Sequence, residues 1–202
     1  MIPAGSRFFP HLTRTVSMPP YNRAKGFSLL ELVMIIVILS IAAGFSSQAW
    51  QWWVSKTRHR VILESYYSLF AYARWSAVSH RSLVTVCPLS KNRCVDDWES
   101  PVSIFLDSNN DKAPDGGEIL RQLNVELGTY TLRSRTAGRG YFQFNSKGMA
   151  YGAMGSLVLC PSNPAEGTMS YMPINIAGRF RAELDHDADG EIKLPWGTTI
   201  QC

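Results

Sequence analysis

Paired metal ligands and catalytic signatures are absent from this sequence. There is no C-x-x-C pair and the four histidines are scattered, so the spacing gives no support to a zinc site. There is also no G-x-S-x-G, no H-E-x-x-H and no phosphate-binding loop. A Ser/His/Asp site has no supporting spacing either. We therefore predict that the protein is not an enzyme and holds no cofactor.

Acidic residues are missing from the first 26 positions, where four basic side chains occur: Arg7, Arg14, Arg23 and Lys25. With those four set aside, 16 of the 20 Lys and Arg residues remain against 16 Asp and Glu residues. The body of the chain is thus nearly neutral, although the formal net charge is +4. This balance argues against a polycation that binds nucleic acid through bulk charge, so any anion site must be a local patch.

One long apolar run, residues 27–45, follows this basic segment. Its 19 residues would span about 28 Å as a helix, close to the roughly 30 Å of a bilayer's hydrocarbon core. Trp50, Trp52 and Trp53 come next, where an interfacial aromatic belt is expected. The sequence therefore predicts a single membrane crossing, with the N-terminus in the cytoplasm because the basic residues precede the run.

Glu31 is the fifth residue of the apolar run. A carboxylate costs on the order of 2.5 to 3.5 kcal/mol at the centre of a membrane helix and less near its end, so it usually has a partner. A conventional signal peptide, with small residues at 42–44, is an alternative that leaves this acid unexplained. Cleavage between Gly26 and Phe27 would instead create an ammonium group one helical turn from Glu31, in the same chain or in a neighbour.

The stretch KGFSLLE at this position resembles the type IV prepilin cleavage site, in which Phe follows Gly and Glu is the fifth mature residue. The resemblance implies that the prepilin peptidase cuts after Gly26 and removes residues 1–26 as a leader. It also implies that Phe27 is N-methylated and that Glu31 pairs with a neighbouring subunit's N-terminus during filament assembly. Met18 is an alternative start, which would give a shorter leader.

No proline or glycine occurs at residues 54–79, where apolar residues recur at helical spacing: Ile62, Tyr66, Leu69, Phe70, Ala73 and Ala77. The pattern predicts that the membrane helix continues outward and ends near residues 80–82, with this apolar stripe against a sheet. Seven β-rich runs follow, separated by turn residues: 83–87, 102–107, 118–125, 129–135, 140–145, 155–161 and 171–184. They predict an antiparallel body of two sheets.

The chain thus divides into a leader at residues 1–26, a transmembrane or filament helix at 27–53, and a periplasmic head at 54–202. The head begins with the continuation of the helix, to about residue 80, and ends with the β-rich body. The predicted fold class is α+β: a long N-terminal helix, transmembrane in one half and amphipathic in the other, packed on a two-sheet head. A membrane-anchored sandwich enzyme would look alike at this level, so the class does not give the function.

All four cysteines fall in the predicted head, and an even number in an exported chain indicates disulfides: Cys87, Cys94, Cys160 and Cys202. Three pairings are possible. The short loop between Cys87 and Cys94 makes that bond the easiest to form, which leaves Cys160 with Cys202. Free buried thiols are the alternative if the chain stays in the cytosol.

Four stretches carry a further resemblance: residues 69–94, 104–121, 141–161 and 175–181. Together they resemble the GspH/FimT family of minor type IV pilins and secretion pseudopilins. The Cys-Pro at 87 and 88 and a Gly-Arg-x-Arg element are more similar to the FimT branch than to the secretion branch. The resemblance implies the type IV pilin fold, insertion in the inner membrane with a periplasmic head, and assembly with other major and minor pilins into an extracellular pilus.

The Gly-Arg-x-Arg element comprises residues 178–181. Strand alternation would place Arg179 and Arg181 on one face and Phe180 on the other. Two neighbouring guanidiniums suit a DNA backbone, and the resemblance implies that Gly178, Arg179 and Arg181 bind DNA during uptake in natural transformation. Two phosphate contacts would give a salt slope of only about −2 and no base specificity.

Two further groups of charges bear on this DNA-binding hypothesis. Glu183 and Asp185 share the predicted face, so cross-strand ion pairing is the structural alternative. A second basic cluster has the same alternation and would extend the patch: Arg133, Arg135 and Arg139. Its alternative is an ordinary solvated strand edge, kept charged against aggregation.

Two acidic turns have partial calcium-loop patterns. The first has oxygen ligands at EF-hand positions but Lys112 where glycine is required: Asp107, Asn109, Asp111, Asp115 and Glu118. The second begins with Asp185, Asp187 and Asp189 before a glycine, but Trp196 stands where the bidentate acid belongs. Neither is flanked by helices, and Asp, Asn and Gly also simply form hairpin turns. No metal is therefore predicted, and both turns stay incomplete calcium candidates.

The sequence as a whole predicts a minor type IV pilin. We expect it to take part in pilus assembly and to bind DNA without sequence preference in natural transformation. The alternative is a structural, GspH-like minor pseudopilin that belongs to a type II secretion system and does not bind DNA.

Overall fold

The computed structural model describes Gly26 and residues 28–152, 154–163 and 167–202, with only the backbone of residues 45–53 and 55. The chain forms two compact units, Met1–Gly44 and Phe45–Cys202. The predicted leader, apart from Gly26, lies outside the described residues, and so does the predicted methylation site Phe27.

Helix α1, Leu29–His80, is shared by the two units. In the first unit, Glu31 lies in its first turn, and the Leu32 N–H donates a 3.1 Å hydrogen bond to the Ser28 carbonyl. The large apolar side chains of residues 29–41 are exposed on all sides of the helix. Across the described residues, no helix is long and apolar enough to span a bilayer. The membrane segment at residues 27–53 stays a prediction, since Phe27 and the side chains of 45–53 lie outside the described part.

In the second unit, α1 buries the predicted apolar stripe: Ile62, Tyr66, Leu69, Phe70, Ala73 and Ala77. The helix stops in a Schellman motif, in which Ser82 N–H donates to Ala77 and Arg81 N–H donates to Val78, both over 3.3 Å. Arg81 has the left-handed conformation that this motif requires, with φ of 51°. The predicted helix end is therefore confirmed.

The first sheet is antiparallel and has five strands in the described part of the chain. They are β1 Val84–Ser90, β2 Arg93–Cys94, β3 Val102–Leu106, β4 Arg121–Leu123 and β6 Phe142–Phe144. The order is β2-β1-β3-β4, and β6 pairs with the start of β1. A 3₁₀ turn, η1 Asp115–Gly117, lies in the connection from β3 to β4. Both faces of β1 are buried over residues 84–88, where Thr85 is the polar residue.

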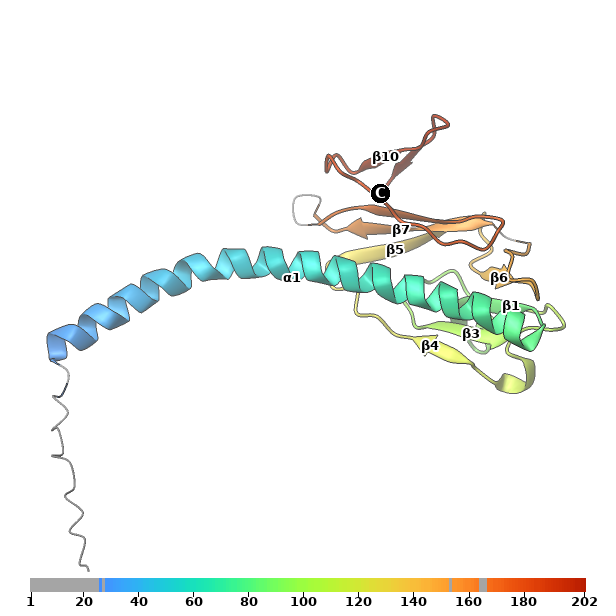
Figure 1. Ribbon diagram of the computed structural model, residues 1–202, viewed down its shortest axis with the longest axis horizontal. Helices are drawn as coiled ribbons and strands as arrows, with labels where there is room; N and C mark the ends of the chain where they lie inside the picture. Colours follow the sequence, from blue (N-terminus) through green and yellow to red (C-terminus); the bar gives the residue numbers. More distant parts are fainter. Residues whose placement is uncertain (1–25, 27, 153, 164–166) are drawn as a thin grey trace, which may run out of the picture. The chain divides into compact units, whose positions relative to one another are not determined.

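The second sheet has the order β5-β7-β8-β9, also antiparallel. Its strands are β5 Tyr130–Arg135, β7 Gly155–Pro161, β8 Ser170–Ile174 and β9 Glu183–Leu184. A two-stranded hairpin follows, formed by β10 Glu191–Lys193 and β11 Thr199–Gln201. Figure 1 shows α1 along one side of the strands and this C-terminal hairpin beyond β7.

The predicted α+β class, with a long helix against antiparallel sheets, is confirmed. Two details differ from the prediction. The run 171–184 is divided between β8 and β9, and a third small sheet joins the two expected ones. Strands β2, β9, β10 and β11 have only two or three residues, too few for alternation to be recognised in a sequence.

Two hydrophobic clusters hold the helix, the two sheets and the C-terminal hairpin together. The larger one joins the stripe of α1 to the inner faces of both sheets. Alternation along β7 sends Leu157 and Leu159 into that cluster and Val158 and Cys160 to the opposite face. There they meet apolar residues of the C-terminal segment in a second cluster: Ile192, Leu194 and Ile200. The second sheet is therefore covered on both faces.

Two disulfides form, Cys87–Cys94 and Cys160–Cys202, with Cα–Cα distances of 5.5 and 5.7 Å. The first closes the β1–β2 connection, and the second fastens the C-terminal residue to β7. The second bond closes a sequence separation of 42 residues and therefore removes more conformational entropy from the unfolded chain. This loss of entropy stabilises the folded state by about 4 kcal/mol for the second bond and about 2 kcal/mol for the first.

Candidate nucleic-acid interface

The Gly-Arg-x-Arg element lies on the returning arm of a tight turn. Gly178 N–H donates to the Asn175 carbonyl over 2.8 Å, and Asn175 N–H donates to the Arg179 carbonyl over 3.1 Å. The Asn175 side-chain oxygen also accepts a 2.9 Å hydrogen bond from the Arg179 N–H. Asn and Gly favour such turns. The prediction of one continuous strand over residues 171–184 is therefore wrong here.

Gly178 has a structural role at the end of this turn. Its φ is +71°, and a Cβ at this position would lie 2.3 Å from the Gly148 carbonyl oxygen. Glycine suits both that backbone conformation and so close an approach. Backbone conformation and packing therefore account for the glycine at position 178.

Phe180 anchors the element in the core. It is 8% exposed, forms an antiparallel bridge with Ile174 and stacks on Phe70 of α1, with ring centroids 4.8 Å apart. Arg179 and Arg181, one residue to either side, are exposed. The alternation expected from the sequence is thus present, although the segment is not a regular strand.

A groove of about 330 Å³ lies between this segment and α1. It is lined by residues 178–181 and by Tyr67, Phe70, Ala71 and Arg74 of the helix. Tyr67 is 59% exposed, and its ring centroid lies 6.0 Å from that of Phe180. Three arginines therefore border one groove, and we call Arg74, Arg179 and Arg181 the groove arginines.

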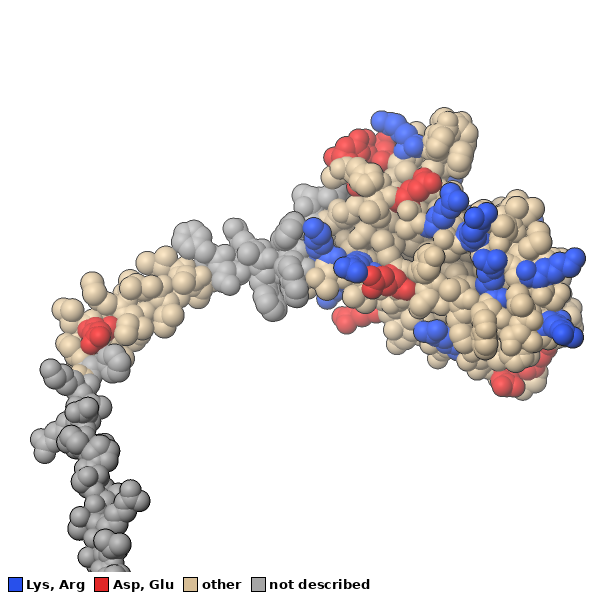
Figure 2. All heavy atoms as spheres, viewed as in Figure 1, with Lys and Arg blue, Asp and Glu red and all other residues tan. Residues whose placement is uncertain are grey.

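Sequence reasoning missed Arg74. Tyr67, Ala71 and Arg74 are spaced by four and three residues, which puts them on one face of a helix. That spacing was the available signal, but it does not reveal which strand-side residues face it. Figure 2 shows basic side chains spread across the visible face of the second unit, with acidic ones between them and at its margins.

Within the described part of the chain, no carboxylate pairs with a groove arginine. The ion pairs found there are Arg60 with Glu64 at 2.7 Å and Lys193 with Asp189 at 3.9 Å. The alternative of cross-strand ion pairing at the Gly-Arg-x-Arg element is therefore not realised among these residues. Among the described residues, the groove thus presents three guanidiniums without a carboxylate partner.

Asp185, one of the acids expected to pair with them, is held by its own loop. It is 6% exposed, and its carboxylate oxygens accept hydrogen bonds of 2.8 and 2.9 Å from the Ala188 and Gly190 N–H groups. Burial alone would raise the pKa of Asp185, but these hydrogen bonds and those from Asp187 outweigh it and hold the pKa below its ordinary value. Asp185 therefore stabilises the turn.

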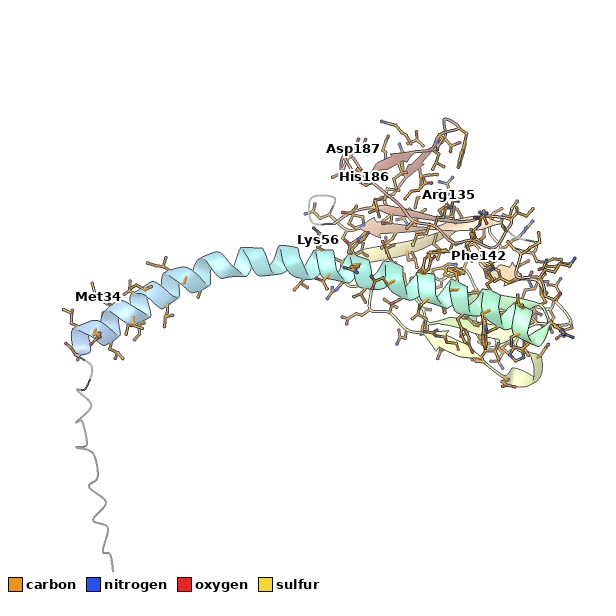
Figure 3. The ribbon with its side chains drawn as sticks, in the orientation of Figure 1. Met34, Lys56, Arg135, Phe142, His186 and Asp187 are labelled. Carbon is orange, nitrogen blue, oxygen red and sulfur yellow. A yellow bond between two sulfur atoms is a disulfide. The ribbon has the colours of Figure 1, made fainter. Side chains whose placement is uncertain are left out.

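Arg135 of the second basic cluster shares a face with Arg181. Arg135 pairs with Ser156, Ser156 pairs with Pro173, and the Arg181 N–H donates to the Pro173 carbonyl over 3.2 Å. Residues directly opposite one another point to the same face, and three strand spacings amount to about 14 Å. Figure 3 labels Arg135 on the side of the sheet near the C-terminal hairpin. Arg135 and Arg181 therefore lie at the two ends of one row across the second sheet, and Arg181, at the edge beside β8, also borders the groove beside α1.

The other two arginines of that cluster bind backbone carbonyls. The Arg133 Nη1 donates to the Cys202 carbonyl over 2.8 Å, and the Arg139 Nη1 donates to the Gly152 carbonyl over 3.1 Å. Arg139 also lies beyond the end of β5, so the alternation expected for all three does not reach it. Of the cluster, Arg135 is the residue best placed for an external anion.

In the first calcium candidate, the side-chain oxygens of Asp107, Asn109 and Asp111 accept hydrogen bonds from other groups of the protein. Asp107 is fully buried and accepts hydrogen bonds from Thr85 Oγ1 at 2.6 Å, Gln143 Nε2 at 3.0 Å and Lys112 N–H at 3.2 Å. Asn109 and Asp111 accept backbone N–H groups within the loop. The side-chain oxygens of Asp107, Asn109 and Asp111 therefore hold the start of the β3–β4 connection in place.

The second candidate brings Asp185, Asp187 and Asp189 together, with one carboxylate oxygen of each within 4.8 Å of the others. Figure 3 labels Asp187 and His186 in this turn. Asp185 is buried and the other two acids are exposed. The Glu191 N–H donates to Asp189 over 2.8 Å, so this acid also caps its own turn.

At the other end of the chain, Gly26 precedes α1 and Glu31 is exposed in its first turn. The cleavage, methylation and pairing expected at these positions stay predictions, because the leader and Phe27 lie outside the described residues.

Comparisons with known proteins agree with this architecture. The model of the family "Type II transport protein GspH" matches residues 63–178, more than half of the chain. A second model, "Prokaryotic N-terminal methylation motif", matches residues 21–47. The first match ends at Gly178, directly before Arg179. No curated protein matches the sequence significantly.

Two solved proteins have similar structures. A crystal structure of the type IV minor pilin FimU of Pseudomonas aeruginosa matches 65% of this chain and 92% of its own, with a TM-score of 0.53 and 20% identity. The minor pseudopilin EpsH from the type 2 secretion system of Vibrio cholerae matches 62% and 96%, with a TM-score of 0.44 and 11% identity. The FimU similarity shows the type IV pilin fold.

Proposed function

The chain belongs to the GspH family, and on that premise we propose that it is a minor pilin that binds the DNA backbone through Arg74, Arg179 and Arg181. It is incorporated into a type IV pilus and takes part in DNA uptake during natural transformation. The observation that carries the proposal is the groove bordered by three arginines, none of them paired with a carboxylate in the described part of the chain.

The chemistry of these side chains suits phosphate. A guanidinium offers planar, paired donors that match phosphate oxygens and stays charged at any physiological pH. Three such contacts would give a salt slope of about −2.7. Because phosphates carry no sequence information, binding is independent of base sequence. Weak, nonspecific binding is what a filament needs if it captures DNA of any origin.

Assembly depends on the other end of the chain. The match to the methylation motif and the Gly26–Phe27 junction support processing by the prepilin peptidase and N-methylation of Phe27. Before assembly the protein is held in the inner membrane with its N-terminus in the cytoplasm and its head in the periplasm. Glu31 then pairs with a neighbouring subunit's N-terminus, and the partners are other major and minor pilins.

A structural pseudopilin of a type II secretion system is the second candidate. The description of the matched family favours it, because the family is named for type II transport. Both candidates are structural pilins rather than enzymes, and they differ in DNA binding. A measurement of that binding therefore separates them.

The test is fluorescence anisotropy of a labelled DNA duplex titrated with the full-length chain in a non-ionic detergent. Arg179→Gln with Arg181→Gln should weaken binding by tenfold or more and reduce the salt slope by about 2. Arg93→Gln removes an exposed arginine of β2 and serves as the matched control. Absence of binding by the wild type at low salt, or equal binding by the double variant, would favour the secretion pseudopilin.

A further inference from the structure

A second groove, of about 340 Å³, lies between the outer face of the second sheet and the C-terminal hairpin. Ser156 and Pro173 line it from the sheet, and Trp196 and Ile200 line it from the hairpin. Arg135, at the end of β5, also lines it. We call it the outer-face groove. It is distinct from the groove beside α1, which contains none of these residues.

Trp196 is the most unusual feature of this groove. It is 68% exposed, although a tryptophan side chain is normally largely buried. It sits in the turn from residue 194 to 198, which is closed by hydrogen bonds of 2.9 Å from Gly197 N–H to the Leu194 carbonyl and from Leu194 N–H to the Thr198 carbonyl. Pro195 and Gly197 suit such a turn, but nothing in it requires tryptophan. The turn fixes the backbone at Trp196, and its side chain belongs to neither hydrophobic cluster.

Charge complements this aromatic ring. Arg135 has no carboxylate partner in the described residues, and its row leads through Ser156 and Pro173 to Arg181. The outer-face groove is therefore lined by an exposed aromatic ring and by Arg135, and the backbone of Arg181 lies about 14 Å from that of Arg135 along the row. Proteins that bind single-stranded nucleic acid combine aromatic side chains, on which bases stack, with basic side chains that contact the phosphates.

We propose that the outer-face groove binds unpaired nucleotides of a single DNA strand, with a base stacked on Trp196 and a phosphate on Arg135. The proposal rests on the DNA-binding function given above and extends it, because the strand continues along the row to Arg181. Paired bases in a duplex are already stacked on one another and cannot use the indole. Trp196 therefore gives preference for single-stranded ends or openings, whereas the groove arginines hold either form.

The test compares a labelled oligothymidylate with a duplex of equal length, titrated by anisotropy with the full-length chain in a non-ionic detergent. Trp196→Ala should weaken binding of the single strand about tenfold and leave duplex binding unchanged, because base–aromatic stacking is lost. Trp196→Phe should retain most of the affinity. Trp75→Ala is the matched control, since Trp75 is 59% exposed on α1 and lies outside both grooves.

Arg135→Gln tests the phosphate contact and should weaken single-strand binding as well. If Arg135→Gln has no effect, the groove takes an apolar partner such as a protein segment and the proposal fails. Equal loss of single-strand and duplex binding in Trp196→Ala, or no loss at all, also overturns it. In these cases, weaker binding of duplex DNA by the Arg179→Gln/Arg181→Gln double variant would still support the proposed function. The failure of this proposal and the failure of the proposed function are therefore distinguishable.

Discussion

The ring of Phe180 stacks on that of Phe70, with centroids 4.8 Å apart and an angle of 22° between the planes. One residue belongs to the Gly-Arg-x-Arg element and the other to α1, and Phe70 is 1% exposed. The contact fixes Arg179 and Arg181 relative to Arg74, although none of the three arginines is itself buried. The candidate binding groove is therefore positioned by the hydrophobic core.

Replacing Phe180 with alanine should test this coupling. Loss of a buried aromatic ring costs about 3 to 5 kcal/mol of unfolding free energy, and the arginines should lose their fixed positions. Urea denaturation measures the first effect and duplex-DNA anisotropy the second. Phe180→Leu keeps an apolar anchor and should retain more of both. DNA affinity unchanged in a folded Phe180→Ala variant would contradict the coupling.

Gly178→Ala should destabilise the head through two separate effects, the positive φ and the approach to the Gly148 oxygen. Gly138→Ala is a matched control, because Gly138 has a similar φ of +77° but open space around its Cβ position. We expect the free energy of unfolding to fall by about 1 kcal/mol in the control and by clearly more in Gly178→Ala. Thermal unfolding of the two variants gives the comparison. Equal losses would mean that the Gly148 contact relaxes at no cost.

His59 should make the stability of the head depend on pH. It is half-buried, its Nε2 lies 2.7 Å from Ser170 Oγ, and burial lowers its pKa from the ordinary 6.5. The unfolded chain therefore binds a proton at a higher pH than the folded one. The contribution of neutral, half-buried His59 to the stability of the fold is thus fully present above about pH 6.5 and is lost as the pH falls below that value.

Melting temperatures measured between pH 8 and pH 5 should show this loss in the wild type and less of it in His59→Gln. Asp185 acts in a separate and more acidic range, because its pKa is lowered from 3.8 and its contribution disappears only below that value. An identical pH profile for His59→Gln and the wild type would contradict the assignment to His59.

Glu31→Ala should leave membrane insertion intact and impair incorporation into the pilus, because a neighbouring N-terminus would lose its carboxylate partner. Fractionation of cells and of sheared pili measures the two steps, and mass spectrometry of the mature chain should find N-methylated Phe27. Glu64→Ala is the control, since Glu64 is an exposed acid on α1 whose ion-pair partner among the described residues is Arg60, at the surface. Normal incorporation of Glu31→Ala would refute the pairing.

Short-range patterns in the sequence determined much of this protein. The apolar stripe of α1, the end of the helix near His80, the longer strands and the alternation of Arg179 and Arg181 with Phe180 all depend on neighbours a few residues away. Local conformational preference and hydrophobic periodicity are sufficient to predict such features.

The tertiary structure decided what depends on distant residues. It joined Arg74 of α1 to the Gly-Arg-x-Arg element, aligned Arg135 with Arg181 through two intervening strands, and selected one disulfide pairing among three. It also kept Asp185 in its own turn instead of pairing it with an arginine. The physical reason is that strand register and helix packing are fixed by burial of a common core, which periodicity within a single segment does not encode.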